Sequence, residues 1–293
     1  MKRSAKWKKI LGIIKYPLTI AILVIVLSRI ELHQVSVILS ELKPGFLVVL
    51  VCISLLKIFL QFTNWNIFLK LIPGVRLKFR ERITSFFAGI SFRIISPGGV
   101  GVYGRMLYLS AGKKDSFLAI TYEKFIQTWC IIFFASIASS LYFIKLALIL
   151  KIILPVVALS LPFLLLFKSP INEKYYHYFQ QYRASLIPAL LLQVTINLLT
   201  IVQYEVFFLN YTRFSLLSAI KSVPLVQAGN LLPVTISGLG IREYLAVSVY
   251  PSLGISKELA VSCALTIFIL SNLLPALVGL FILLFKSDIL ESK

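Results

Sequence analysis

The sequence predicts an all-α fold, a polytopic transmembrane helix bundle with about six full spans and two re-entrant helical hairpins in inverted repeats. Three observations support this prediction. Hydrophobic residues make up 59% of the 293 residues, charged residues make up only 14%, and the mean hydropathy is +0.92. A soluble domain is about 45–50% apolar and roughly 25% charged, so this chain has too few polar residues to cover a soluble surface. The apolar residues also gather in runs of about 20, and two further runs are interrupted by proline and glycine.

Six apolar runs have the length that a helix needs to cross the hydrocarbon core of a bilayer. The expected spans are Ile10–Leu27, Gly45–Phe68, Phe117–Phe143, Leu146–Phe167, Ser185–Leu209 and Leu259–Phe285. The first run follows a cluster of basic residues and is not followed by a small-residue cleavage site. This pattern favours a signal anchor over a removable signal peptide.

Two apolar regions, Ile83–Leu109 and Leu216–Tyr250, are interrupted in the middle. The first contains SPGGVGVYG at Ser96–Gly104, and the second contains LPVTISGLG at Leu232–Gly240. Neither half of either region is long enough to span, and a broken segment at membrane depth is tolerated only where protein or a wet cavity surrounds its freed backbone. Each region is therefore interpreted as a re-entrant helical hairpin. Two ordinary kinked spans are the alternative interpretation.

The distribution of basic residues predicts the topology. If the N-terminus is cytoplasmic and each broken region enters and leaves on one side, cytoplasmic segments hold 18 Lys and Arg residues and external segments hold 6. This bias follows the positive-inside rule and predicts a multi-pass protein of the plasma or inner membrane with both termini cytoplasmic. It also accounts for the net charge of +19 without nucleic acid as a partner, since no DNA- or RNA-binding motif accompanies the charge.

The two broken regions resemble each other in sequence. Ala88-Gly89 precedes Gly98, and Ala228-Gly229 precedes Gly238, with the same spacing and a constant offset of 140 residues. In the predicted topology the first hairpin enters from the cytoplasm and the second from outside. Inverted repeats of this kind place the substrate site of secondary transporters near the bilayer midplane, at the broken helices. We therefore predict one integral membrane domain over residues 1–293, with repeat halves of roughly 10–143 and 146–285 and no soluble domain.

Several ionisable residues lie deep in the apolar runs, where each is costly and therefore a candidate for function. They are Arg93, Glu123, Lys124, Arg242 and Glu243. The alternative is that they pair with one another as structural ion pairs, which is weak evidence for any further role. Three other embedded lysines, Lys15, Lys57 and Lys151, are expected to extend their ammonium groups towards an interface.

The glycine-rich breaks and the nearby arginines suggest a binding site for the phosphate of an anionic lipid head group. A helix that begins inside the membrane exposes unpaired N–H groups and the positive end of its dipole, and glycine permits close approach of an anion. Arginine supplies a planar fork that suits phosphate. The predicted substrate-binding residues are Arg93, Ser96, Gly98, Gly99, Gly101, Arg105, Glu123, Lys124, Ser237, Gly238, Gly240, Arg242 and Glu243.

No catalytic residue, metal site or cofactor is predicted. The three cysteines are far apart within apolar runs, and the two histidines have no metal-ligand spacing. Gly99–Gly104 matches the pattern GxGxxG, but a dinucleotide site also requires a preceding strand and a βαβ unit, which this apolar helical context does not provide.

These motifs resemble the lysylphosphatidylglycerol synthetase transmembrane region family, which includes the flippase domain of the multiple peptide resistance factor. Gly238–Glu243 after Leu232-Pro233 resembles the family signature GxGxRE, Ser96–Gly101 resembles its first motif, and Glu123-Lys124 resembles its Glu-Arg pair. The resemblance extends from about Leu18 to Phe285. The chain departs from it at Gly101-Val102, where members commonly have Gly-Glu, and this argues against a carboxylate role there.

The resemblance implies a lipid flippase or carrier for an anionic phospholipid or lipid-linked intermediate, with paired re-entrant hairpins and a possible homodimer. It also implies that this chain lacks the aminoacyl-transferase domain of the full-length synthetases and is not an enzyme. The alternatives are an integral membrane transferase acting on a polyprenyl-phosphate sugar and a scaffold for cell-envelope glycolipid synthesis. The expected partners are an anionic membrane lipid, the bilayer and, for a scaffold, lipid-synthesis enzymes.

Overall fold

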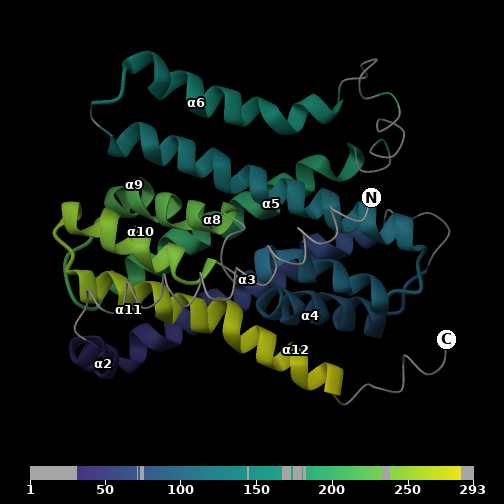
Figure 1. Ribbon diagram of the computed structural model, residues 1–293, viewed down its shortest axis with the longest axis horizontal. Helices are drawn as coiled ribbons and strands as arrows, with labels where there is room; N and C mark the ends of the chain where they lie inside the picture. The colour runs from purple at the N-terminus through teal and green to yellow at the C-terminus, as the bar shows by residue number, and fades with distance from the viewer. Residues whose placement is uncertain are drawn as a thin grey trace, which may run out of the picture.

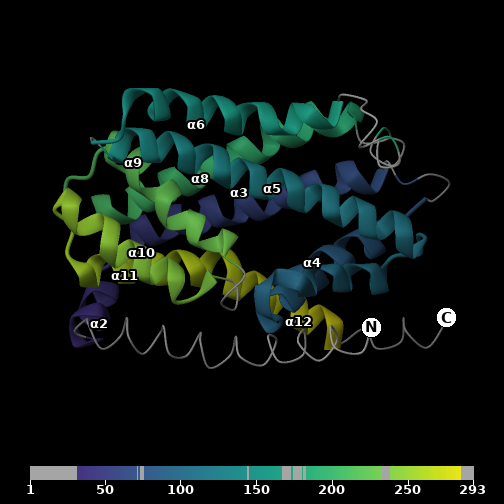
Figure 2. The same cartoon turned by 45° about the horizontal axis from the view of Figure 1, so that its top comes forward.

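The computed structural model is built of helices throughout the part of the chain that it describes (Figure 1). The described residues are 32–70, 72, 76–143, 145–166, 173, 180, 183–232 and 238–284. Long helices run side by side along the longest axis of the molecule, and shorter helices are held between them (Figures 1 and 2). A chain of this composition, folded in this way, is a multi-pass membrane protein.

Four helices are long and apolar enough to cross a membrane. They are α3 (Pro44–Lys70), α5 (Lys113–Tyr142), the segment Arg183–Leu209 that contains α8 (Leu186–Leu209), and the segment Lys257–Leu283. The shortest of these has 27 residues, and a helix of that length reaches about 40 Å, whereas the hydrocarbon core is about 30 Å thick. All four occur where the sequence predicts a span.

The other two predicted spans have different outcomes. The span expected at Leu146–Phe167 is a shorter apolar helix, α6 (Leu148–Ser160), which continues into the 3-10 helix η2 (Leu161–Leu166). It lies at one edge of the molecule along α5 (Figure 2). Most of its aliphatic side chains are exposed. The span expected at Ile10–Leu27 lies outside the described residues, which begin with the short helix α2 (Leu32–Ser40).

The last long segment is one continuous helical rod with a single widened, π-helical turn in its middle. It consists of α11 (Lys257–Phe268), the π-helix η7 (Ile269–Leu273) and α12 (Leu274–Leu284). Short π-helical turns inside α-helices often occur at functional sites. Gly279 of α12 lies directly against α4, because a Cβ there would overlap the Ser91 hydroxyl and the Phe87 carbonyl.

Both interrupted regions fold as helical hairpins. The first pairs α4 (Phe79–Ile95) with the 3-10 helix η1 (Pro97–Tyr108). The second pairs α9 (Leu216–Gln227), extended by η4 (Ala228–Leu231), with α10 (Ile241–Val249) and η6 (Tyr250–Leu253). The first opens towards the end of the molecule where α3 ends and α5 begins. The second opens towards the opposite end, between α8 and α11 (Figure 1).

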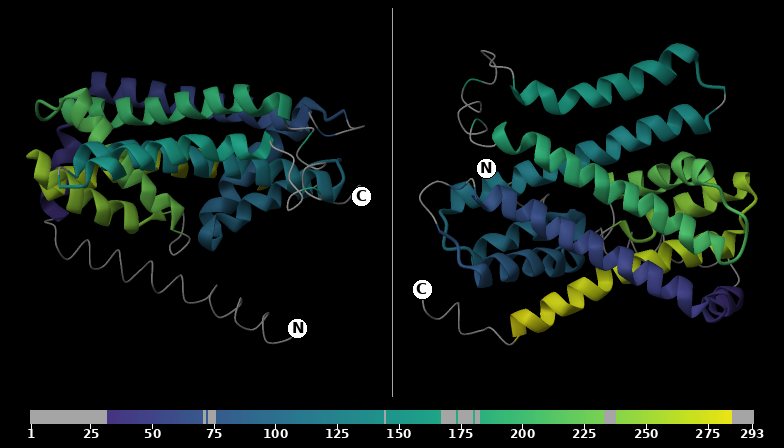
Figure 3. Two further views of the ribbon diagram at one scale, coloured as in Figure 1. Left: turned by 90° about the horizontal axis from the view of Figure 1, so that it is seen from above. Right: turned by 180° about the vertical axis from the view of Figure 1, so that it is seen from behind.

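The helices recur at the offset of 140 residues that the glycines suggested. Helix α3 corresponds to α8, α4 to α9, η1 to α10, and α5 to the rod α11–α12. Helices α3 and α8 lie side by side and run in opposite directions (Figure 3). Each half also packs its last span on the hairpin of the other half, since α5 contacts α9 and α12 contacts α4. Each half therefore makes the equivalent contact with the other half.

The closest contacts within the hairpins follow the same offset. A Cβ at Gly89 would overlap the side chain of Arg105, and a Cβ at Gly229 would meet the side chain of Leu245. Both partners are again 140 residues apart. Glycine at these two positions allows the arms of each hairpin to lie close together.

Two aromatic-rich cores surround the two hairpins. The first lies between α3, α4, η1 and α5, and the second lies between α8, α9, α10 and α11. The largest fully buried aromatic side chains are Trp65, Phe68, Phe86 and Tyr122 in the first core and Tyr204, Phe207, Phe208 and Tyr250 in the second. These cores fix the hairpins against the long helices, so the polar residues near the hairpin turns are held in defined positions.

Candidate functional site

A cavity of about 450 Å³ lies where the turns of the two hairpins approach the long helices. Both hairpins line it, together with α3, α5, α8 and the rod α11–α12. Among the described residues that line it, five are basic and one is acidic. The basic residues are Lys57 of α3, Arg93 of α4, Arg105 of η1, Lys124 of α5 and Arg242 of α10, and the acid is Glu123 of α5.

The turn of the first hairpin is made by Ser96. Its backbone is extended (φ −96°, ψ 137°), which ends α4, and its Oγ accepts a hydrogen bond from the Gly101 N–H at 2.5 Å. Pro97 then begins η1, where its missing N–H is not required. The side of Gly101 on which a Cβ would project is filled by the carbonyl of Phe92 and by Ser96 Oγ. Gly101 therefore serves the packing of the two arms.

Arg105 extends from η1 to a buried ion pair with Glu123 on α5. Its guanidinium also lies over the ring of Trp65, 4.6 Å from the centroid, in a cation–π contact. Gln127 donates through Nε2 to the second carboxylate oxygen of Glu123 at 3.0 Å. A buried ion pair is tolerated when its remaining polar atoms are hydrogen-bonded, and Gln127 meets that requirement for Glu123.

Lys124 lies beside this pair and donates to Gln127 Oε1 at 2.7 Å. One amide side chain therefore joins the carboxylate of Glu123 and the ammonium of Lys124. Because the amide is neutral, it provides Lys124 with a hydrogen bond but does not compensate its charge.

Arg93 connects the first hairpin to the π-helix of the last span. Its Nη2 donates to Asn272 Oδ1 at 2.6 Å. The preceding residue of the π-helix, Ser271, faces Lys57 on α3, with 3.4 Å between Ser271 Oγ and the Lys57 Nζ. The widened turn thus brings two polar side chains of an apolar rod against two cations of the cavity.

The turn of the second hairpin contains two glycines in the left-handed region, Gly238 (φ 77°) and Gly240 (φ 87°). Other residues adopt this conformation only at a cost, which explains the glycines of the Gly238–Glu243 motif. Gly240 precedes the first turn of α10, and its N–H donates to Glu243 Oε2 at 2.6 Å. The other oxygen of Glu243 accepts from Arg242 Nη2 at 3.1 Å. Arg242, 2% exposed, also lies over the ring of Phe268 at 4.9 Å.

Lys57 is the clearest correction to the sequence analysis, which expects it to reach towards an interface. It is only 5% exposed, and its Nζ donates to Gln203 Oε1 at 2.8 Å. Gln203 in turn donates to Ser54 Oγ at 2.7 Å and to the Leu50 carbonyl at 3.2 Å. The lysine stays in the interior because the Gln203 side chain of α8 accepts its hydrogen bond there. Gln203 is itself held by its hydrogen bonds to α3. Lys151 is half-buried on α6, and Lys15 lies outside the described residues.

The structure brings most of the predicted binding residues to the cavity or to its immediate supports. The cavity is lined directly by Arg93, Arg105, Glu123, Lys124, Gly238 and Arg242. Supporting positions are held by Ser96 and Gly101 in the first turn, by Gly98 and Gly99 at the start of η1, and by Gly240 and Glu243 in the second turn. Ser237 lies outside the described residues.

The sequence analysis did not identify the side-chain amides that accept hydrogen bonds from the basic residues of the cavity. Gln127, Gln203 and Asn272 each accept a hydrogen bond from a cation of the cavity. The available signal was an isolated carboxamide within an otherwise apolar run, which is costly in a membrane unless it has a partner. The residue with which each amide pairs could not be read from the sequence, since Lys57 and Gln203 are 146 residues apart.

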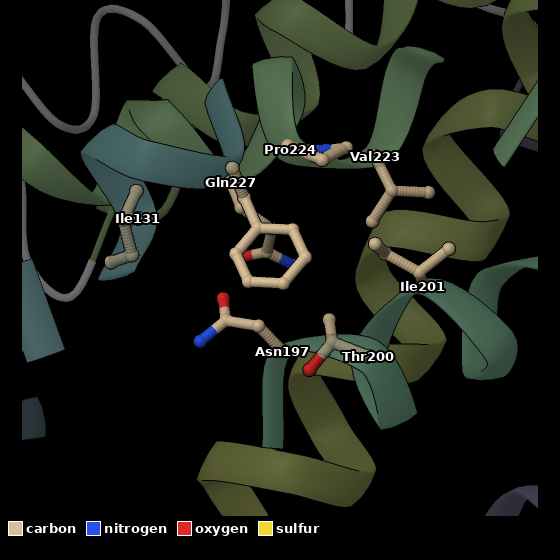
Figure 4. Close-up of a pocket in the computed structure, with 8 residues that line it drawn as sticks. Ile131, Asn197, Thr200, Ile201, Val223, Pro224 and Gln227 are labelled. Atoms are coloured by element: carbon tan, nitrogen blue, oxygen red, sulfur yellow. The ribbon is translucent and has the colours of Figure 1, made fainter. Parts of the chain in front are cut away.

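A second, much smaller cavity of about 10 Å³ lies between α5, α8 and α9. Figure 4 shows the side chains around it, with Asn197 and Thr200 on one side and Val223 and Pro224 on the other. It has room for about one water molecule. Three of its lining residues, Ile131, Thr200 and Gln227, also line the large cavity, so the two spaces are neighbours on the α5–α9 side.

The chemistry that this arrangement offers is the binding of an anion in a water-poor interior. Charges inside a membrane protein mark substrate or ion sites when they face a cavity, and here five cations do so. No group of three or more His, Cys, Asp and Glu that could hold a metal ion occurs among the described residues. Guanidinium groups from both hairpins and an ammonium from α5 provide donors of the kind that bind phosphate.

Comparison with known protein families supports the resemblance seen in the motifs. A family model described as lysylphosphatidylglycerol synthase TM region matches residues 11–279, which is most of the chain. No curated protein matches the sequence. In this family the transmembrane region is a domain separate from the catalytic domain, and its membership indicates a membrane role related to lipids. The chain belongs to the lysylphosphatidylglycerol synthase transmembrane-region family.

Proposed function

We propose that this protein is a flippase or carrier that moves an anionic membrane lipid between leaflets. The observation that carries this proposal is the central cavity, in which basic side chains from five different helical elements converge. Buried cations are costly in an apolar interior, and a ligand of opposite charge relieves that cost. The head group would occupy the cavity while the acyl chains remain in the surrounding lipid.

Two ion pairs would stabilise the arginines of the site whenever no ligand is bound. Glu123 holds Arg105, and Glu243 holds Arg242, one pair for each hairpin. An arriving phosphate would compete with the carboxylates for the two guanidinium groups, because each can donate to more than one acceptor. The carboxylates would recover their partners when the lipid leaves, so neither arginine would remain a bare charge.

The arrangement of the halves suggests how the site would open to both sides. We propose that both hairpins are re-entrant and that the two halves form an inverted-topology repeat. The opposite openings of the hairpins and the equivalent contacts of α5 with α9 and of α12 with α4 support this reading. In such transporters, rocking of one repeat against the other exposes a fixed central site alternately to each side. The positive-inside rule favours cytoplasmic termini.

The test is lipid exchange in liposomes that contain the purified protein and a fluorescent phosphatidylglycerol, with a membrane-impermeant quencher reporting the outer leaflet. We expect exchange above that of empty liposomes. Arg242→Gln should lower the rate by about tenfold or more, because a neutral amide replaces a buried cation of the cavity. Arg213→Gln is the matched control, since Arg213 is exposed and is not among the residues that line the cavity. Failure of the wild-type protein to exchange any anionic lipid faster than empty liposomes, or a folded Arg242→Gln variant with an unchanged rate, contradicts the proposal.

A further inference from the structure

The charge balance of the cavity narrows the class of lipid, and this inference rests on the function proposed above. Five basic side chains line the cavity, and two carboxylates accompany them, Glu123 as part of the lining and Glu243 against Arg242. The two carboxylates pair with two of the arginines, which leaves Lys57 and Lys124 without a carboxylate partner among the described residues. Each carboxylate is already engaged, Glu123 with Arg105 and Glu243 with Arg242.

The two lysines are met by amides. Lys57 donates to Gln203 at 2.8 Å, and Lys124 donates to Gln127 at 2.7 Å. Arg93 likewise donates to an amide oxygen, that of Asn272 at 2.6 Å. An amide oxygen satisfies a donor without neutralising its charge. These hydrogen bonds hold the two lysines at the cavity without neutralising them, so an anionic ligand would supply the compensating charge.

A head group with a single negative charge would compensate one lysine and leave the other in a low-dielectric interior, where an uncompensated charge is costly. A phosphodiester such as phosphatidylglycerol is of this kind. A terminal phosphate monoester carries about 1.5 to 2 negative charges at neutral pH. Two linked phosphates carry at least as much charge, spread over more oxygens and a greater length. The two lysines come from different helices, α3 and α5, so a longer anion can reach both.

The size of the cavity agrees with a ligand larger than one phosphate. Sites for drug-sized molecules enclose about 300–1,000 Å³, and the volume of about 450 Å³ here falls within that range. Gln193 also lines the cavity, and its Oε1 is buried and has no hydrogen-bond partner. It provides an acceptor for a hydroxyl group attached to the head group. We propose that the ligand of this cavity is a diphosphate lipid, with two linked phosphates between its hydrocarbon chain and whatever group it carries.

The experiment compares three fluorescent lipids that share one polyprenyl chain and differ only at the head. They are the diphosphate, the monophosphate and the methyl phosphate diester, which has a single negative charge. Binding to the purified full-length protein in detergent is measured by thermophoresis. We expect the diphosphate to bind at least about tenfold more tightly than the diester, with the monophosphate between them. Equal affinities for the diphosphate and the diester, or tightest binding of the monophosphate, would overturn the inference.

Variants test whether the two lysines provide the preference. Lys57→Gln combined with Lys124→Gln should reduce the preference for the diphosphate to less than about threefold, while Lys124→Arg should preserve it. Lys113→Gln is the control, because Lys113 is exposed at the start of the same helix as Lys124. If the double variant does not fold, Lys124→Gln alone should lower the preference. An unchanged preference in a folded variant lacking one or both lysines would count against the inference.

The same three lipids in the liposome exchange assay test the proposed lipid exchange and the inferred ligand class separately. Exchange of the diphosphate lipid alone, or its fastest exchange among the three, supports both the proposed function and the diphosphate class. Equal exchange of all three lipids supports the proposed function and overturns the preference for diphosphate. Tight and selective binding of the diphosphate without exchange of any lipid upholds the inferred ligand class and contradicts flipping.

Discussion

The buried pair of Arg105 and Glu123 gives two variants that should both lose stability but should change ligand affinity in opposite directions. Glu123→Gln and Arg105→Gln both break the same ion pair, whose two side chains are almost fully buried at the edge of the cavity. Removing one partner of a buried pair costs about 3–5 kcal/mol, because the other charge is left without compensation. The Coulomb energy of two unit charges about 4 Å apart at an effective dielectric constant of about 20 is about 4 kcal/mol, which agrees with that range.

The effect on an anionic ligand differs in sign between the two variants. Glu123→Gln removes a negative charge from the cavity lining and frees Arg105, so we expect tighter binding of an anionic lipid. A phosphate about 6 Å from the lost carboxylate would gain up to about 3 kcal/mol, and screening by neighbouring dipoles brings the expected gain to about tenfold to a hundredfold in affinity. Arg105→Gln removes a cation instead and should weaken binding by a comparable factor.

Both quantities can be measured on one purified sample. Unfolding in a detergent titration reports stability, and the fluorescence of Trp65, whose ring lies under the Arg105 guanidinium, is among the signals that should change. Affinity is then measured with a fluorescent anionic lipid. Replacement of both Arg105 and Glu123 by glutamine is the control, since it removes the pair without leaving a bare charge and should cost less than either single change. If the two single variants shift the affinity in the same direction, the assignment of the pair to the anion site is wrong.

Three further changes test other parts of the site. Gly101→Ala places a methyl group against the carbonyl of α4 and should lower stability by about 1–3 kcal/mol in a thermal unfolding assay, whereas Gly45→Ala, which has open space around it, should not. Gly240→Ala and Gly254→Ala impose similar strain of about 1–2 kcal/mol because both glycines have positive φ, but only the former should also slow lipid exchange. Lys57→Met should leave the free energy of unfolding unchanged or higher, since it removes a buried cation, and should weaken binding of an anionic lipid; stronger binding would refute its role.

The long helices were predictable because the bilayer imposes a length and a composition on them. The apolar runs at 45–68 and 117–143 became α3 and α5 with only small changes at their ends, since nothing beyond their own hydrophobicity was needed to place them. Proline and glycine, which punctuate the chain at Ser96-Pro97 and at Gly238, marked the two regions that fold as pairs of helices, whereas their re-entrant placement stays a prediction.

The site was only partly predictable because its geometry depends on pairs that are distant in sequence. Arg105, Glu123 and Arg242 attracted attention as charges inside apolar runs. The sequence did not show that Lys57 would be held inside by Gln203, because a lysine in an apolar run reaches an interface or stays buried according to which residue meets it. The glycines also proved ambiguous. Gly101 permits the contact of two protein segments, and a motif alone does not distinguish that role from close approach to a ligand.

The π-helix at Ile269–Leu273 sets the rotational phase between the two halves of the last span. Helix α11 packs on α10 of the second hairpin, while α12 places Gly279 against α4 of the first. Successive residues of an α-helix differ by about 100° in direction, so one residue fewer in that turn would swing α12 by about that angle and carry Gly279 away from α4. The extra residue of the π-helical turn therefore lets α11 face the second hairpin while α12 faces the first. A shift of the turn along the rod would rotate only the residues between its old and new positions, Ser271 or Asn272 among them, while both ends of the rod kept their orientation towards the hairpins.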